Sequence, residues 1–173
     1  MSEDWTEGVN EAARDIALAA EHGSAPATAA EEVGSLLITL GKAAGHADHL
    51  ASPGSAGRTA REHFRQHMLD AGVVAVLMLR RSHEQQGRAA PAPRELTGEL
   101  ARRRVIPGRQ TQTAGEPTPS GHAAGALGEA MVALGRAVTL KLYEDNPAAL
   151  DDAIERVLAA AIAAVALAPR ESP

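Results

Sequence analysis

The chain has 173 residues, carries a net charge of −5 at neutral pH and contains no cysteine. This length fits one ordinary domain or two very small ones. The acidic balance disfavours nucleic acid as a main partner, because no broad basic surface would attract a polyanion. The absence of cysteine excludes disulfides, thiolate zinc sites and thiol catalysis, and it suits a reducing cytoplasm.

Hydrophobic residues make up 45% of the chain, but aromatic residues make up only 2%. Alanine, which has the highest helix propensity, therefore has to supply much of the core. Runs of β-branched residues bounded by turns are nearly absent, so we expect an all-α helical bundle. The first residues are acidic and polar, and the longest apolar run, residues 157–169, is too short to cross a bilayer. We therefore expect a cytoplasmic protein with no membrane segment.

Apolar spacing and turn signals predict five main helices. The first ends before Gly23, and the second carries an apolar stripe that includes Val33, Leu36 and Leu40. The third is apolar on most sides, as is typical of a central helix. In chain order, the expected helices cover residues 11–21, 27–44, 59–81, 123–143 and 147–168.

The segments between these helices divide the chain into three expected parts. A loop rich in His, Ser, Gly and Pro is expected at residues 45–57. Residues 85–121 are rich in proline and arginine, and we interpret them as a linker with room for a short helix over residues 94–104. The expected organisation is a first helical unit at 1–84, the linker at 85–121 and a second helical hairpin at 122–173.

The second and fourth expected helices resemble each other at a constant offset of 94 residues. Residues 33–43 match residues 127–137, and both glycines of the first copy coincide with glycines of the second. Each copy is followed by a loop and an alanine-rich apolar helix. The simplest account is a pair of hairpins related by a pseudo-twofold axis, and chance similarity between alanine-rich helices is the alternative.

Acidic side chains occur within the strongly apolar helices of the first unit. Glu31 and Glu32 lie on the second helix, and His67 and Asp70 lie on the third. Residues three positions apart share a helix face, so antiparallel packing would let Glu32, Ser35, His67 and Asp70 converge. A carboxylate on a buried face is costly unless it is compensated, and a divalent cation such as Mg²⁺ or Mn²⁺ compensates it economically.

The same residues also fit ordinary structural roles. Glu31 and Glu32 fit acids of a first helical turn, which the helix dipole favours. Asp70 fits an ion pair with a neighbouring arginine, and His67 fits a packed or half-exposed histidine. The sequence alone leaves both interpretations open.

A second candidate site follows from the repeat. Shifting the third helix onto the fifth by 85 residues places Asp152 and Glu155 at the positions of His67 and Asp70. Together with Glu129 on the fourth helix, these acids form a second candidate metal site. Acids on the solvated surface of ordinary helices are the alternative.

The order Glu31-Glu32-x-x-Ser35 followed by His67-x-x-Asp70 resembles the MazG-like all-α nucleotide pyrophosphohydrolases. Their pattern is E-E-x-x-E on one helix and E-x-x-D on the next, and the resemblance covers roughly residues 10–82. It implies that Glu32 and Asp70, with His67, bind Mg²⁺, and that Glu31 or Glu32 acts as the general base. The chain departs from the family at Ser35 and His67, where the family has glutamate, and this removes two negative charges from the metal site.

The resemblance implies Mg²⁺-dependent cleavage of a nucleoside triphosphate to the monophosphate and pyrophosphate, or a diverged form of that activity. A nucleotide and further copies of the chain are the expected partners, and no substrate-binding residue is assigned. The main alternative is a catalytically inactive helical module that binds a nucleotide or a protein and assembles into oligomers. A purely structural helical dimer is a third interpretation.

Overall fold

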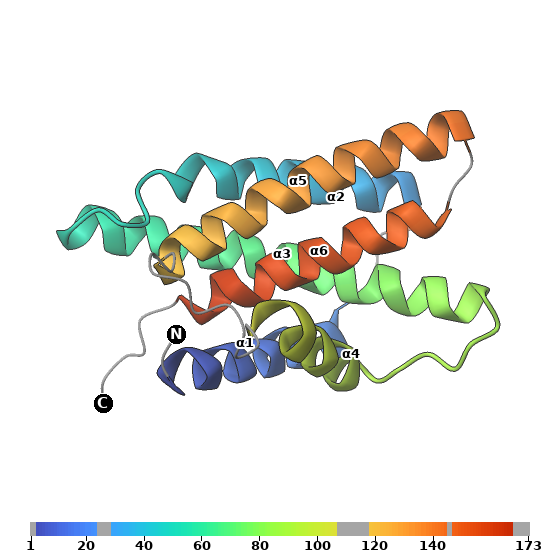
Figure 1. Ribbon diagram of the computed structural model, residues 1–173, viewed down its shortest axis with the longest axis horizontal. Helices are drawn as coiled ribbons and strands as arrows, with labels where there is room; N and C mark the ends of the chain where they lie inside the picture. The colour runs from blue at the N-terminus through green and yellow to red at the C-terminus, as the bar shows by residue number, and fades with distance from the viewer. Residues whose placement is uncertain (1–2, 24–28, 107–117, 145–146, 168–173) are drawn as a thin grey trace.

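The computed structural model is built from helices and describes residues 3–23, 29–106, 118–144 and 147–167 (Figure 1). No strand occurs within these ranges, so the expected all-α bundle is confirmed. The helices are α1 Glu3–His22, α2 Ala29–Ala47, α3 Gly54–Gln85, α4 Pro93–Leu100, the π-helical turn η1 Ala101–Val105, α5 Pro119–Glu144 and α6 Pro147–Ala166.

The helices lie in three layers (Figure 1). The long helices α3 and α6 form the central layer and pack against each other. On one side, α2 covers α3 and α5 covers α6, so that α2–α3 and α5–α6 are two antiparallel hairpins. On the other side, α1 packs against α3 and α6 and is joined by α4 and η1. One apolar core includes residues from every described helix.

The central layer is close-packed because its contact residues are small. Gly72 of α3 faces Ala161 of α6, and a β-carbon added at Gly72 would lie only 2.9 Å from the β-carbon of Ala161. Ile16 of α1 contacts the same position from the other layer, at 3.3 Å. Alanine and glycine thus allow the backbones of α3, α6 and α1 to approach closely, which offsets the shortage of large aromatic side chains.

Several element boundaries differ from the expected ones. Helix α1 begins at Glu3 rather than near residue 11, because Trp5 and Val9 continue its buried stripe toward the N-terminus. Helix α3 begins at Gly54 rather than at residue 59 and continues to Gln85. The expected loop at 45–57 is therefore reduced to a short turn between α2 and α3.

The segment that was expected to be a linker contributes to the core. The expected short helix is present as α4 and η1, and its side chains Leu96, Leu100 and Val105 are buried. Thr97 is buried as well, and its hydroxyl donates a hydrogen bond of 2.9 Å to the carbonyl oxygen of Pro93. Residues 107–117 of the same segment lie outside the described residues.

The two copies of the sequence repeat are buried in the same pattern. Leu36 and Leu40 of α2 are fully buried, as are Ala130 and Leu134 at the equivalent positions of α5. Glycines at the equivalent positions 41 and 135 are exposed in both copies. The repeated pattern therefore selects the same inward and outward faces in the two outer helices.

Candidate functional site

Glu32 is a buried carboxylate with an arginine partner. Only 2% of the residue is exposed, and its Oε1 accepts a hydrogen bond and an ion pair from the guanidinium group of Arg81 on α3. A buried acid needs a compensating group, and in the structure this group is Arg81. Glu31, on the neighbouring side of α2, is exposed.

Glu32 and Asp70 lie at different levels of the α2–α3 hairpin. Glu32 contacts Arg81, which lies 11 residues beyond Asp70 on α3, a distance of about 16 Å along a helix axis. Asp70 is exposed and accepts a hydrogen bond of 3.2 Å from Gln66 on its own helix. The structure therefore does not bring together Glu32 and Asp70, which the sequence analysis expects to share a cation.

The histidines at the other end of this hairpin fix its register. His46 of α2 lies against His63 and His67 of α3, with ring centroids 5.1 Å and 5.8 Å apart. Burial lowers the pKa of His67, and the nearby positive charges of His46 and Lys42 lower it further, whereas Asp70 opposes this effect. His67 thus packs with another histidine, near Asp70 but far along the hairpin from Glu32.

Within the described parts of the chain, no group of three or more His, Asp or Glu side chains is positioned to hold a metal ion. Glu32 and His67 each have protein partners, and the carboxylate of Asp70 is solvated. The Mg²⁺ or Mn²⁺ site implied by the family resemblance stays a prediction.

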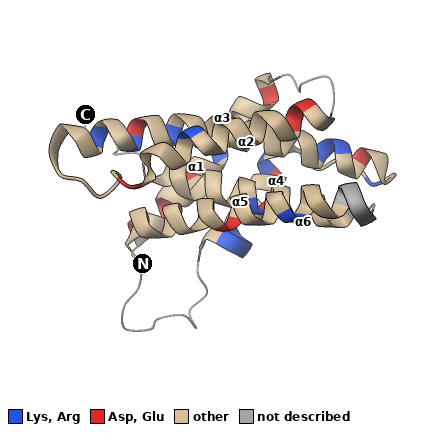
Figure 2. Ribbon diagram, turned by 90° about the horizontal axis from the view of Figure 1, so that it is seen from above, with Lys and Arg blue, Asp and Glu red and all other residues tan. Residues whose placement is uncertain are grey.

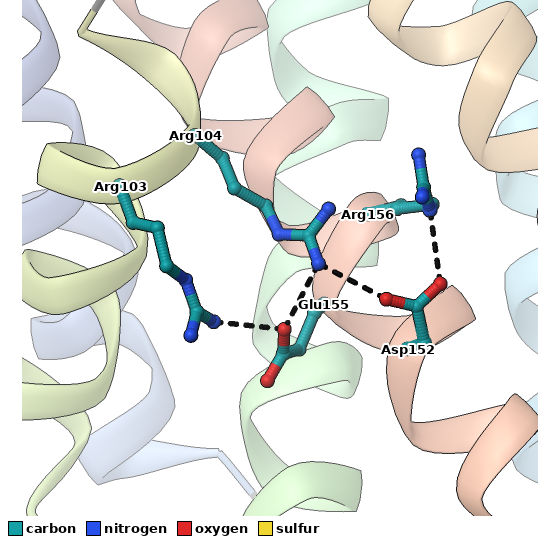
Figure 3. Close-up of polar contacts among 5 residues, drawn as sticks. All are labelled: Arg103, Arg104, Asp152, Glu155 and Arg156. Atoms are coloured by element: carbon teal, nitrogen blue, oxygen red, sulfur yellow. Dashed lines mark hydrogen bonds and ion pairs between the residues drawn. The ribbon is translucent and has the colours of Figure 1, made fainter. Parts of the chain in front are cut away.

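Two acids of the second candidate site, Asp152 and Glu155, take part in an arginine–carboxylate network between η1 and α6 (Figure 3). Arg103 donates to Glu155 at 2.8 Å, and Arg104 donates to both Asp152 and Glu155, at 3.0 Å and 3.3 Å. Arg156, one turn beyond Asp152 on α6, donates to it at 3.0 Å. The hydrogen bond from Arg156 is the main cause that lowers the pKa of Asp152, so this carboxyl stays ionised.

Geometry of η1 explains why two consecutive arginines reach the same helix. A π-helical turn is wider than an α-helical one and is frequent at functional sites. The turn contains Arg102, Arg103 and Arg104, and the last two of these both point toward α6 (Figure 3). From its sequence this basic run is expected in the linker, because nothing in its local pattern indicates that α4 and η1 dock on α6.

Two adjoining cavities lie beside the network. The first, of about 320 Å³, lies between η1, α5 and α6 and is lined by Arg104, His122, Glu129 and Arg156 among others. The second, of about 470 Å³, lies between α5 and α6 and shares Glu129 and Arg156 with the first. Glu129, the third acid of the second candidate site, therefore lies in the cavity walls rather than in the ion-pair network.

The outward face of α2 and α5 is the other unusual surface. Leu37 and Ile38 of α2 are 43% and 63% exposed, and Val132 of α5 is 57% exposed. Figure 2, viewed from the side of these two helices, shows that charged positions are sparse along them. Residues Pro119–Leu140 of α5 are long and apolar enough to cross a membrane by length and composition alone, and only 28% of that stretch is buried.

Glycines on the same face have open space beside them. A β-carbon added at any of these glycines would meet no heavy atom within 4 Å outside the helix, so the fold of one chain does not require a glycine there. In α2 the glycines and Ile38 follow one another at intervals of three or four residues. In α5 the glycines and Val132 follow one another at the same intervals. The glycines concerned are Gly34, Gly41 and Gly45 in α2 and Gly125, Gly128 and Gly135 in α5.

Comparisons of this chain with protein-family models, with curated proteins and with solved structures give no match. The fold and the sites described above therefore define the chain as an all-α bundle with an arginine–carboxylate network on one side and an apolar, glycine-lined face on another.

Proposed function

We propose that this chain is a self-assembling helical module, and that the outward face of α2 and α5 is where a second copy binds. The observation that supports this most directly is the exposure of Leu37, Ile38 and Val132 on that face. Large apolar side chains that cluster on one surface are typical of protein–protein contacts. Leu18 of α1, the remaining large apolar side chain that is clearly exposed in the described residues, is isolated from them in sequence and layer.

The glycines strengthen the proposal, because they cost helix stability without serving the single chain. A glycine in a helix interior is less favourable than alanine by about 0.5–1 kcal/mol. Spacings of four and three residues place the glycines and the apolar side chains on one seam, which is the spacing at which two helices pack along each other. Small residues on such a seam let two backbones approach closely, so a partner helix would explain both features.

The charges beside the seam favour a second copy over an unrelated partner. Glu129 and Arg136 lie seven residues apart on α5, on the same flank of the seam and on either side of Val132. A twofold axis near Val132 would pair two antiparallel α5 helices, with Glu129 of each copy opposite Arg136 of the other. A twofold interface has to be complementary to itself, and this arrangement of charges meets that condition.

The size of the face also fits a dimer. Helices α2 and α5 have 19 and 26 residues and contact each other side by side. At 1.5 Å per residue they form a face roughly 30–40 Å long and two helices wide. A stable interface buries about 800 Å² on each partner, which a face of this size can supply.

A membrane is a weaker candidate for the same face. Glu129 lies near the middle of the apolar stretch Pro119–Leu140, and Arg136 follows two turns later, and both are exposed on the outer side. A charged side chain in the centre of a bilayer is expensive and needs a partner. A second protein chain would satisfy both charges by ion pairing, whereas lipid tails would not.

The proposal is tested by the oligomeric state of the purified chain and of the double variant Ile38→Asp/Val132→Asp. Light scattering after size exclusion and sedimentation equilibrium should give a dimer for the native chain and a monomer for the variant. The matched control is Leu18→Asp, which places the same charge at a 58% exposed apolar position of α1 and should leave the dimer intact. Circular dichroism establishes that all three proteins are folded.

Three results would overturn the proposal. The native chain could be a monomer at all concentrations measured, or Leu18→Asp could dissociate the dimer as well as the double variant does. The native chain could instead co-sediment with neutral phosphatidylcholine vesicles in a manner that Val132→Asp abolishes, which would assign the face to a membrane.

Nucleotide pyrophosphohydrolysis, which the MazG-like resemblance implies, stays a prediction from the sequence. It depends on Glu31, Glu32 and Asp70, of which Glu32 is ion-paired with Arg81 and the other two are exposed. The test is pyrophosphate release from a panel of nucleoside triphosphates with Mg²⁺ or Mn²⁺. Activity that is lost in both Glu32→Gln and Asp70→Asn would support the enzyme, provided that both variants remain folded.

A further inference from the structure

The cavity between η1, α5 and α6 has the features of a small ligand site. Its volume of about 320 Å³ is at the lower end of the range for ligand pockets, which is roughly 300–1,000 Å³. Its polar wall consists of Arg104, His122, Glu129 and Arg156. The polar groups thus come from three separate elements and face one space.

The guanidinium groups of this wall are held in place before any ligand arrives. Arg104 is fixed by its bonds to Asp152 and Glu155, and Arg156 is fixed by its bond to Asp152 (Figure 3).

The wall of the first cavity presents two guanidinium groups, those of Arg104 and Arg156, and one carboxylate, that of Glu129. Guanidinium groups bind phosphate and carboxylate oxygens through charge-assisted, directional hydrogen bonds.

We propose that this cavity binds a small phosphate ester, whose phosphate is held by Arg104 and Arg156. Phosphate is favoured over a planar carboxylate because the two arginines approach from different elements, η1 and α6, and a tetrahedral group offers oxygens in several directions. The organic part of the ligand lies against Val105, Ala126 and Ala159, which provide the apolar wall of the same cavity. Among the described residues, no Phe, Tyr or Trp lines either cavity, so recognition is directed at the phosphate rather than at a stacked base.

The chain contains its own reporter for this site. Trp5 is the only tryptophan of the sequence, and its ring lies 5.9 Å from the ring of His122, edge to face. His122 lines the cavity, so a ligand that contacts it changes the surroundings of Trp5. Tryptophan fluorescence can therefore be titrated directly, with calorimetry as an independent measurement.

The experiment titrates the full chain with inorganic phosphate, ribose 5-phosphate and AMP, at constant ionic strength set with chloride. The phosphate esters should give a saturable change in fluorescence and a matching heat, and Arg156→Gln should weaken their binding by about tenfold or more. The control is Arg102→Gln, which removes an exposed arginine of the same turn η1 that lies outside the cavity and should bind within about twofold of the native chain. Comparison of AMP with ribose 5-phosphate separates a nucleotide from a sugar phosphate.

Several results would contradict the proposal. These are the absence of both fluorescence and heat changes, an equal response to sulfate or citrate at the same ionic strength, and equal weakening by Arg102→Gln and Arg156→Gln. Because Arg156 also anchors Asp152, the melting temperature of each variant shows whether the fold is retained. This test measures ligand binding, whereas the test of self-assembly measures the oligomeric state, so either proposal can fail without the other.

Discussion

The ion pair between Glu32 and Arg81 makes a quantitative prediction about the outer hairpin. Replacing Arg81 with alanine would leave the carboxylate of Glu32, only 3% exposed in its side chain, without a partner. Removing one member of a fully buried pair costs about 3–5 kcal/mol. The guanidinium of Arg81 is 33% exposed, so water screens the pair in part, and we expect a loss of about 2–3 kcal/mol in the free energy of unfolding.

A double-mutant cycle separates this effect from the loss of packing. The double variant Glu32→Leu/Arg81→Met removes both charges and keeps apolar volume, so it should recover most of the stability that Arg81→Ala loses. Urea unfolding followed by circular dichroism measures the free energies, and for a chain of this size the single variant should melt roughly 4–12 °C lower. Glu32→Gln should cost less than Arg81→Ala, because its amide oxygen still accepts a hydrogen bond from Arg81.

The cycle also tests the interpretation of Glu32. If Arg81→Ala changed stability by less than about 0.5 kcal/mol, Glu32 would have to be compensated by something other than Arg81. If the single and double variants were equally unstable, the loss would come from packing and not from an unpaired charge. Either outcome would refute the assignment of Glu32 as the structural partner of Arg81.

Three further predictions follow from particular contacts. Gly72→Ala should lower the free energy of unfolding by about 1–2 kcal/mol, because the added methyl group would press on Ala161 and Ile16. Gly41→Ala should raise the free energy of unfolding by roughly 0.5–1 kcal/mol, because the added methyl group meets open space and alanine favours the helix. Urea unfolding at concentrations where the chain is monomeric measures both changes. Lowering the pH from 7 to 5 should reduce the melting temperature, because burial lowers the pKa of His67 and His122 in the folded chain. The stability that these neutral histidines contribute above their ordinary pKa of 6.5 is lost as the pH falls below 6.5. His122→Gln should make the melting temperature depend less on pH. Millimolar Mg²⁺ should leave the melting temperature of the native chain unchanged, because Glu32 is engaged by Arg81, and a rise that Asp70→Asn abolishes would instead support the magnesium site.

The positions of the main helices could be predicted from the sequence because the outer helices have a regular apolar period. Leu36 and Leu40 of α2 and Leu134 of α5 are fully buried, as their spacing indicates. The start of α1 was missed because Trp5 and Val9 are separated by polar residues and look like an acidic N-terminal segment. They are apolar positions four residues apart, so extending the stripe of Ile16 backwards by whole turns would have included them.

The contribution of α4 and η1 to the core could not be read from local pattern. Residues 91–106 contain prolines and a run of arginines, which favour a linker by composition. Their burial is decided by contacts with α1 and α6, which lie far away in sequence. Leu96, Leu100 and Val105, spaced by four and five residues, are the local signal that a short helix with one apolar side was present.

The candidate site illustrates a limit that arises from hairpin register. The sequence places Glu32 and Asp70 on adjacent helices, but their distance depends on how far one helix is shifted along the other. In the structure Arg81 lies at the level of Glu32, while His46 lies beside His63 and His67. A shift of α3 along α2 by three helical turns would change the partner of Glu32 from Arg81 to Asp70. No local sequence pattern determines the size of this shift.

The amino-acid composition indicates which kind of positive charge pairs with the candidate acids. Of the 17 lysine and arginine residues, only two are lysines, Lys42 and Lys141, and the rest are arginines. Arginine is the basic residue best suited to partly buried ion pairs, because its planar group offers several directed donors and is weakly hydrated. Of the candidate acids, Glu32 in the first hairpin and Asp152 with Glu155 in the second are bound by arginines. A cation would have to displace guanidinium groups to bind these carboxylates, so the excess of arginine over lysine is itself an argument that these three acids hold helices together.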